Sequence, residues 1–188
     1  MASIEYREDG VSEAAAFEAD ADVGRPVDLD AFKAVLGRFA TGVSVMTTIA
    51  EGSPHGMTVN ALASVSLEPP LVLVCVERGT VMAASLARSG TFALSFLAVG
   101  QAAVSEAFAD SSRPEGADQF AGLVTSSAVT GAPIFPDAVA WVDCRVWATY
   151  DGGDHVIVIG EVVALDTNVS DEPLLYYRSE YGRFRPGR

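Results

Sequence analysis

The sequence predicts a mainly β protein, in which about six strands form an antiparallel sheet closed into a small barrel with a few short helices. Three observations predict this class. Runs of alternating or β-branched apolar residues recur along the chain, turn residues separate them, and no regular alternation of strands with helices persists. A parallel, doubly wound sheet would need that alternation, so we expect an antiparallel one.

The composition fits one globular domain of 188 residues, 49% of them hydrophobic. We expect residues 1–27, rich in Ala, Glu and Asp, to be a flexible acidic tail, and residues 28–188 to form the domain. This tail lacks the pattern of a secretion signal, and no apolar run reaches the ~20 residues of a membrane span. The expected location is therefore the cytoplasm.

The charge balance restricts the partners. Twelve Lys and Arg face 25 Asp and Glu, for a net charge of −13, which repels phosphate backbones and anionic lipid. We therefore expect no nucleic acid and no membrane as partners, and any anionic ligand needs a local cation. The two cysteines lie in apolar runs and the two histidines are far apart, so we expect buried thiols and no metal site.

The N-terminal half of the domain begins with a helix and a hairpin. Asp28 or Asp30 can cap a helix whose apolar residues repeat at helical spacing, so its apolar face is expected in the core. These apolar residues are Leu29, Phe32, Val35, Leu36 and Phe39. The β-branched run 43–49 and the segment 56–62 flank the turn 51–54 and predict a hairpin.

The remaining elements follow from similar signals. The run 71–76 is apolar throughout, which predicts a strand buried on both faces, and Thr80 can cap a helix over 81–88. A strand over 91–97, a helix over 101–109 and loops over 110–116 and 131–136 come next. Strands over 138–150 and 155–165 form a long hairpin around a Gly-rich turn, and in the first of them the even positions are expected in the core.

Two polar features suggest a ligand. In a regular strand, Thr58, Asn60, Ser64 and Ser66 face the same way and offer a row of hydrogen-bonding groups to a flat heteroaromatic ring; the alternative is a solvated strand face. Arg78 and Thr80 directly precede a helix, where a guanidinium and free N–H groups suit a phosphate; the alternative is an ordinary helix cap.

His155 follows a Gly-Gly-Asp turn, a position at which histidine is often a plain surface residue. Its neighbour Asp154 would point to the opposite face of a strand, so a Ser-His-Asp relay is not expected. The apolar hairpin is expected to pair with a second copy of the chain, because it leaves more apolar surface than one barrel covers. Its residues in this argument are Trp141, Trp147, Val156 and Val158.

Several blocks in fixed order, over about residues 29–184, resemble the flavin reductase family, the small reductase components of two-component flavin-dependent monooxygenases. They are Phe39-Ala-Thr-Gly-Val43, the segment from His55 to Cys75, Gln101 to Phe108, Gly153-Asp-His155 and Pro173-Leu-Leu-Tyr-Tyr-Arg178. The resemblance implies a six-stranded antiparallel Greek-key split barrel, a homodimer with flavin near its interface, and a nicotinamide nucleotide as reductant.

The resemblance also implies which residues bind the cofactors. It places the proposed catalytic residue His155, with Tyr177 and Arg178, beside the nicotinamide nucleotide, and it shows Ser179 where the family has a glycine. The flavin-binding residues that it implies are Pro54, Met57, Thr58, Val59, Asn60, Ala61, Ser64, Ser66, Cys75, Glu77, Arg78, Thr80 and Phe108.

The expected function is that of an NAD(P)H:flavin oxidoreductase, which reduces FMN or FAD and supplies free reduced flavin to a partner monooxygenase. NADH is the expected reductant and NADPH stays possible, because no cluster of basic residues for a 2′-phosphate stands out. Hydride transfer between the cofactors needs no strong protein acid or base. The alternatives are a non-catalytic flavin- or haem-binding split barrel and an oxidase that retains its flavin.

Overall fold

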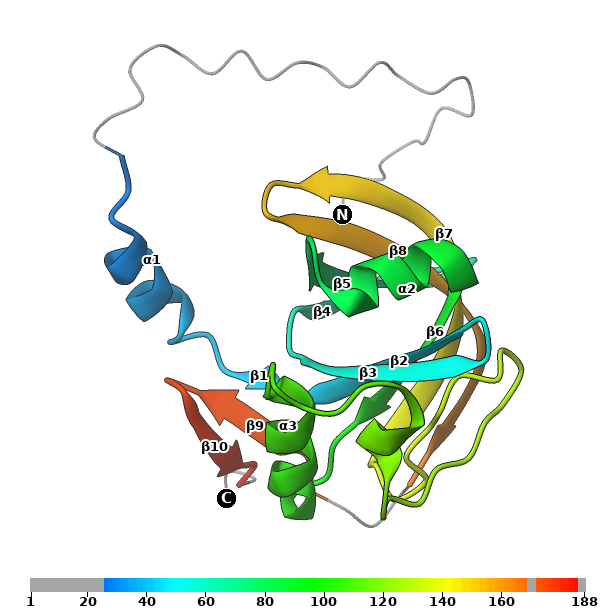
Figure 1. The fold of residues 1–188 in the computed structure, drawn as a ribbon. Coiled ribbons are helices and arrows are strands. Elements are labelled where there is room, and N and C mark those ends of the chain that lie inside the picture. The colour runs from blue at the N-terminus through cyan, green and yellow to red at the C-terminus, as the bar shows by residue number, and fades with distance from the viewer. Residues whose placement is uncertain (1–25, 169–171, 186–188) are drawn as a thin grey trace, which may run out of the picture.

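The computed structural model describes residues 26–168 and 172–185 (Figure 1). The predicted acidic tail lies outside these residues except at positions 26 and 27, so its flexibility and the domain boundary stay predictions. The helices are α1 (Leu29–Leu36), α2 (Val81–Ser89), α3 (Ala102–Ala109) and the 3-10 helices η1 (Val99–Gln101) and η2 (Gly116–Phe120). The strands are β1 (Thr41–Gly42), β2 (Ser44–Ala50), β3 (Ser53–Val59), β4 (Leu62–Leu67), β5 (Pro70–Glu77), β6 (Thr91–Phe96), β7 (Ala140–Gly152), β8 (His155–Thr167), β9 (Leu174–Tyr177) and β10 (Glu180–Arg183).

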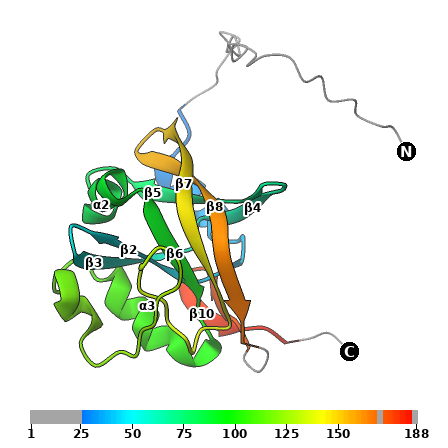
Figure 2. The same ribbon diagram turned by 90° about the vertical axis from the view of Figure 1, so that its right-hand side faces the viewer.

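A seven-stranded sheet in the order β3-β2-β6-β7-β8-β5-β4 forms the body of the protein, and all of its pairs are antiparallel (Figures 1 and 2). The two edge strands, β3 and β4, are consecutive in the chain and joined only by Asn60 and Ala61. The sheet therefore curves until its edges meet at this junction, as in a barrel that is split there. The mainly β, antiparallel class is confirmed, although the sheet has seven strands rather than six.

A second, three-stranded sheet in the order β1-β9-β10 was not predicted. Its strands are only two to four residues long, too short for a clear alternation of apolar and polar residues. Strands β9 and β10 are joined by Arg178 and Ser179, both of which have positive φ. This turn folds β10 back along β9, and β9 pairs with β1, which directly precedes β2.

The hydrophobic core lies inside the curved sheet and below α2. The first cluster centres on buried residues of β2, β5, β6 and α2, with Cys144 among them. Burial raises the pKa of the Cys144 thiol to about 12. The expectation that β5 is buried on both faces is wrong, because only Val74 and Val76 are buried and their neighbours are partly exposed. A fully buried strand needs cover on both faces, and one face of β5 lacks it.

Local signals placed α2 and α3 well. The Thr80 hydroxyl accepts a hydrogen bond from the Ala83 amide at 3.2 Å, so Thr80 caps α2 as predicted. In β7, however, the prediction that the even-numbered residues lie in the core holds only in part. The strand bulges after Asp143, and this fully buried carboxylate accepts hydrogen bonds from the amide and the hydroxyl of Thr130.

Helix α1 differs from the prediction in its environment. Asp28 caps it, through a 2.8 Å hydrogen bond from the Ala31 amide to its side chain, and its apolar stripe forms. None of its residues is buried, however, and Figure 1 shows it standing away from the sheet. The expectation that its apolar face lies in the core is wrong for a single chain. Within the described residues, no helix is long and apolar enough to cross a membrane.

Candidate functional site

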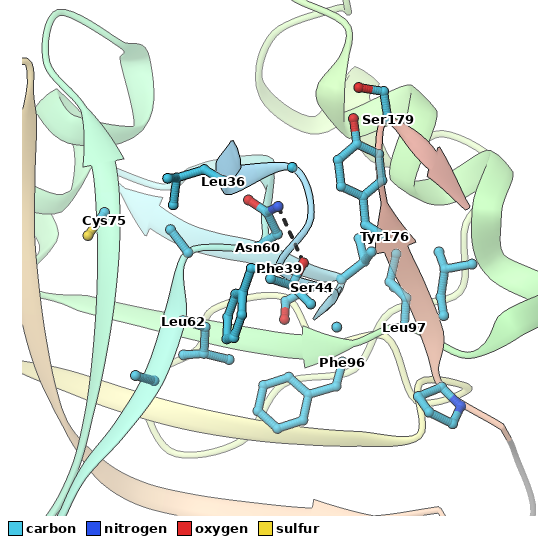
Figure 3. Close-up of a pocket in the computed structure, with 18 of the residues that line it drawn as sticks. Leu36, Phe39, Ser44, Asn60, Leu62, Cys75, Phe96, Leu97, Tyr176 and Ser179 are labelled. Atoms are coloured by element: carbon cyan, nitrogen blue, oxygen red, sulfur yellow. Dashed lines mark hydrogen bonds between the residues drawn. The ribbon is translucent and has the colours of Figure 1, made fainter. Parts of the chain in front are cut away.

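A cavity of about 1030 Å³ opens where the barrel is split, between α1, the β3–β4 junction and the second sheet (Figure 3). Its size is at the upper end of the range for small-molecule sites. Most of its wall is apolar, with a few hydroxyl and amide groups among the apolar side chains. The lining residues labelled in Figure 3 are Leu36, Phe39, Ser44, Asn60, Leu62, Cys75, Phe96, Leu97, Tyr176 and Ser179.

The β3–β4 junction supplies the polar edge of this cavity. The Cys75 amide donates to the Ala61 carbonyl at 3.1 Å, and the Asn60 side-chain amide donates to the Thr41 hydroxyl at 3.4 Å. Three of the predicted flavin-binding residues, Asn60, Ala61 and Cys75, therefore line one cavity. The predicted row of four polar residues on one strand is wrong, because the chain leaves β3 at Asn60 and enters a different pair of strands with a bulge between Ser64 and Ser66.

Thr58 lies in a second, smaller cavity of about 190 Å³, which shares Asn60 and Tyr176 with the large one. Its hydroxyl donates to the Ser105 carbonyl at 2.6 Å, and the Ser105 hydroxyl pairs with the Tyr181 hydroxyl at 2.8 Å. Thr58 therefore holds α3 against β3, and its hydrogen bond is already made within the protein.

Several other predicted flavin contacts do not line the large cavity. Phe108 is only 1% exposed and packs against Phe120 and Phe135, so the structure places it in the core. Val59 is buried opposite Ser44, and Met57 packs against the main core cluster. The sequence blocks alone do not distinguish such packing positions from ligand contacts.

The remaining predicted contacts on β3 and β4 are also outside the cavity lining. Pro54 is the second residue of β3, near the end opposite to the β3–β4 junction. Ser64 faces Val72 across the β4–β5 pair, and the Ser66 hydroxyl accepts from the Glu68 amide at 3.2 Å. The structure therefore does not gather all of the predicted flavin residues in one place.

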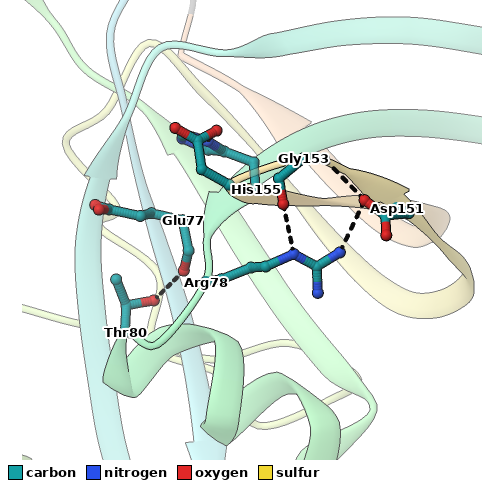
Figure 4. Close-up of polar contacts among 7 residues, drawn as sticks. Glu77, Arg78, Thr80, Asp151, Gly153 and His155 are labelled. Carbon is teal, nitrogen blue, oxygen red and sulfur yellow. Dashed lines mark hydrogen bonds and ion pairs between the residues drawn. The ribbon is translucent and has the colours of Figure 1, made fainter.

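The end of β5 forms a separate polar group with the β7–β8 turn (Figure 4). Arg78 does not stand free: its Nε donates to the Gly153 carbonyl at 2.8 Å, and its Nη2 is 3.2 Å from the Asp151 carboxylate. The Thr80 hydroxyl donates to the Glu77 carbonyl at 2.8 Å while it caps α2. These contacts match the alternative of a helix cap more closely than a free phosphate site.

His155 begins β8 at this same turn, opposite Glu77 of β5. Its Nδ1 lies 2.7 Å from the Asp154 carboxylate, and its side chain is 42% exposed. The expectation that the two side chains point apart is wrong, because Asp154 lies in the turn and not in the strand. The imidazole beside it holds the pKa of the Asp154 carboxyl below its usual value.

The two C-terminal residues predicted beside the nicotinamide nucleotide do not line the large cavity. Tyr177 is exposed at the end of β9 and Arg178 lies in the β9–β10 turn, and neither lines the large cavity. Tyr176 and Ser179 line it instead, and so does Lys33 of α1. None of these three residues was predicted as a binding residue, although Tyr176 lies in the block 173–178 and Ser179 departs from the family glycine.

The second histidine, His55, is buried in a different polar cluster. Its Nδ1 is 2.9 Å from the Gln119 amide nitrogen, and its Nε2 is 3.4 Å from Nη2 of Arg113. Burial, together with the positive charge of Arg113, lowers the pKa of His55 to about 4. The ring is therefore neutral at pH 7.

The large cavity suits a flat aromatic ring system with polar edges. Leucine and phenylalanine side chains offer surfaces for a ring, while Asn60, Thr41 and the junction backbone offer donors and acceptors at its edge. Within the described residues, no group of three or more His, Cys, Asp or Glu side chains is placed to hold a metal ion. The apolar surfaces and the polar groups at their edge fit a flavin ring.

Known proteins match this chain over most of its length. The model of the Flavin reductase like domain matches residues 36–185. The NADH-dependent FAD reductase of Streptomyces globisporus is 41% identical over 88% of this chain and 91% of that protein. HsaB, the reductase subunit of a flavin-dependent monooxygenase of Rhodococcus jostii, is 36% identical over 86% of this chain and 81% of that protein.

Solved structures match the fold as well. The NADH:FAD oxidoreductase of Streptomyces globisporus superposes with a TM-score of 0.80 at 39% identity, over 89% of this chain and 99% of that one. BorF, the flavin reductase component of a bacterial two-component tryptophan halogenase, superposes with a TM-score of 0.79 at 38% identity, over 86% of this chain and all of that one.

Proposed function

The chain belongs to the flavin reductase-like family, and from this premise we propose that it is an NADH-dependent flavin reductase. It reduces FAD or FMN and supplies the reduced flavin to a separate flavin-dependent monooxygenase component. The relatives named as reductases match this chain nearly end to end. The observation that carries the proposal is the large cavity at the β3–β4 junction, whose wall fits a flavin ring.

The residues of the chain bind and orient rather than act as strong acids or bases. Flavin, when bound, supplies the acceptor for the hydride of NADH. The apolar wall excludes water from the ring, and Asn60 with the junction backbone orients its polar edge. We propose that His155, Tyr177 and Arg178 contact the nicotinamide nucleotide, which approaches from the side of the exposed turns.

The test is NADH oxidation by purified protein with excess FAD or FMN, followed without oxygen by the loss of the absorbance of oxidised flavin. We expect turnover with NADH and with at least one flavin. If neither NADH nor NADPH is consumed with either flavin, the proposal fails and a non-catalytic flavin- or haem-binding barrel replaces it. If reduction occurs but the reduced flavin stays bound, an oxidase that retains its flavin replaces it.

A pair of variants tests the cavity itself. Asn60→Ala removes a cavity-lining amide and should raise the flavin Kd about tenfold, the loss of about one hydrogen bond. Asn168→Ala is the matched control, because this exposed asparagine hydrogen-bonds to the Pro136 carbonyl and does not line the cavity. Equal flavin affinity of the two variants would place the flavin elsewhere.

We also propose that the protein is a homodimer. The long hairpin supports this in part, because Val158 is buried in the core but Trp147 is exposed; the stronger support is α1, whose apolar residues are all exposed. A second copy that covers α1 would remove these side chains from water and close one side of the large cavity.

Light scattering should give twice 19.6 kDa, and Phe32→Asp should lower that mass. A monomeric wild-type protein at micromolar concentration contradicts this proposal.

A further inference from the structure

Arg78 connects the end of β5 to the turn between β7 and β8. Its Nε donates to the Gly153 carbonyl at 2.8 Å, its Nη2 is 3.2 Å from the Asp151 carboxylate, and its backbone amide donates to the Asp154 carbonyl at 2.9 Å (Figure 4). Arg78, which directly follows β5, thus contacts Asp151 near the end of β7 and both turn residues, Gly153 and Asp154. We refer to these contacts as the Arg78 clamp.

The turn is also held from within. The Gly153 amide donates to the Asp151 side chain at 2.8 Å, and Gly153 has a φ of 76°, which only glycine adopts without strain. This amide, followed by Arg78, holds the pKa of the Asp151 carboxyl below its usual value. Asp151 is therefore ionised at neutral pH and remains a partner for the guanidinium.

The turn sets the position of His155. The carboxylate of Asp154 only accepts hydrogen bonds, so the 2.7 Å contact requires a hydrogen on Nδ1 of His155. In the neutral ring this leaves Nε2 as the acceptor. The backbone amide of Arg78 holds the Asp154 carbonyl, and the Arg78 side chain holds Gly153, which directly precedes Asp154, so the clamp bears on the residue that orients the imidazole.

We propose that Arg78 is a positioning residue for His155 and not a ligand of the flavin phosphate. The clamp holds the turn so that Asp154 fixes the tautomer and the direction of the His155 ring for the nicotinamide nucleotide. This inference rests on the proposed reductase function.

The charges favour this role over phosphate binding. Two guanidinium nitrogens already face the Gly153 carbonyl and the Asp151 carboxylate, and Asp154 and Glu77 add further acidic side chains around the turn. A phosphate placed beside Arg78 would meet these carboxylates, which oppose a second anion. The sequence predicted Arg78 as a local positive charge for an anionic ligand. The neighbouring carboxylates offset this charge.

The kinetic test compares Arg78→Ala with Arg88→Ala. Arg88 is the matched control: it is an arginine of similar exposure whose nearest carboxylate, that of Glu51, is 4.0 Å away, and the same charge is lost. We expect Arg78→Ala to raise the NADH KM about two- to fivefold over the control, as for the loss of partly exposed charged contacts. The flavin Kd should stay within about twofold of the control.

A double variant tests whether Arg78 acts through His155. If it does, Arg78→Ala should raise the NADH KM little further in a protein that already carries His155→Ala, because residues that act as a unit are not additive. A purely additive result overturns the proposal. So does a flavin Kd about tenfold higher in Arg78→Ala than in Arg88→Ala, since that is the size expected of a phosphate ligand.

A measurement without turnover separates this proposal from the proposed function. The chain has only two histidines, so the ring nitrogens of His155 can be followed by NMR, with buried His55 as the internal reference. Arg78→Ala should shift the His155 ring signals and speed hydrogen exchange of the Gly153 amide, while His55 stays unchanged. Unchanged His155 signals and exchange overturn the positioning role, whether or not the protein reduces flavin. Absent flavin reduction with shifted signals overturns the proposed function alone.

Discussion

The two histidines lie in polar clusters of similar composition and opposite exposure. Each cluster joins a histidine to an arginine whose Nε donates to a backbone carbonyl: Arg113 to Gly56 at 3.1 Å, and Arg78 to Gly153 at 2.8 Å. His55 is 7% exposed and faces the cationic Arg113, whereas the side chain of His155 is 42% exposed and faces an anionic carboxylate. His55 is therefore a buried structural residue, whereas a ligand can reach the ring of His155.

The difference follows from the partners. The Gln119 carbonyl oxygen accepts from the Gly56 amide at 3.0 Å, so its amide nitrogen donates to Nδ1 of His55. These hydrogen bonds join β3 to η2. A second proton on the ring would have to go to Nδ1, which already accepts from Gln119, and would place a positive charge beside Arg113. At the β7–β8 turn the partner of the ring is a carboxylate, and water or a ligand reaches the rest of the imidazole. The type of residue alone therefore does not decide its role.

Removing His55 should have the largest effect on stability. His55→Ala leaves Gln119 without its ring partner and opens a void under the 110–120 segment, so the free energy of unfolding should fall by about 3–4 kcal/mol. Urea denaturation measures this change. A loss below about 1 kcal/mol would mean that the cluster around His55 does not stabilise the fold.

Acid should weaken the protein through the same residue. The pKa of His55 is lowered from 6.5 to about 4 in the folded chain, so between these values the unfolded chain binds a proton that the folded chain does not. This contribution is fully present above pH 6.5 and is lost as the pH falls to about 4, by about 3 kcal/mol in total. Urea denaturation from pH 7 to pH 4 should show this slope, and His55→Gln should flatten it. An equal slope in both proteins contradicts the assignment.

The backbone beside His55 should tolerate no side chain. A Cβ added at Gly56 would lie 2.5 Å from a ring carbon of buried Phe108, so Gly56→Ala should lower the free energy of unfolding by about 1–3 kcal/mol. Gly100→Ala is the control, because no atom lies within 4 Å of its added Cβ. Thermal unfolding of both variants distinguishes the close packing of Gly56 against Phe108 from a general effect of losing a glycine. Equal melting temperatures of the two variants would contradict this close packing.

The smallest expected change in stability is at the exposed histidine. His155→Ala should change the free energy of unfolding by no more than about 0.5 kcal/mol, as for a surface substitution. Under the proposed function it should still raise the NADH KM about tenfold, the equivalent of one lost hydrogen bond to a charged group. Urea denaturation and steady-state kinetics on the same preparation test both parts. A large loss of stability with unchanged kinetics would reverse the roles assigned to the two histidines.

Local sequence signals predicted much of the fold. The cap Thr80 was correct, and so was Asp28, one of the two predicted for α1, because each hydrogen bond joins residues three positions apart. The β7–β8 hairpin was correct because alternation and a Gly-rich turn are local features. The short strands β9 and β10 were missed because four residues carry too little pattern, and their pairing with β1 joins distant parts of the chain.

The candidate site was predicted in part. Ordered blocks identified the segment that contains Asn60 and Ala61, but they did not show that the chain changes strand pairs there. Phe108 stands in such a block although it is a core residue, since packing preserves a sequence pattern as well as binding does. Lys33 and Tyr176 reach the cavity only because α1 and β9 lie beside it in space.

The sequence by itself determined the antiparallel class, the helix caps, the turns and the family, because each of these depends on residues close together in the chain or on blocks in a fixed order. The tertiary structure alone decided which polar groups remain available to a ligand. Arg78 illustrates the reason: its partner Gly153 lies 75 positions away, and this contact turns an apparently free cation into part of a clamp. Burial and partner charge depend on the packing of distant segments, so they decided the different environments of His55 and His155.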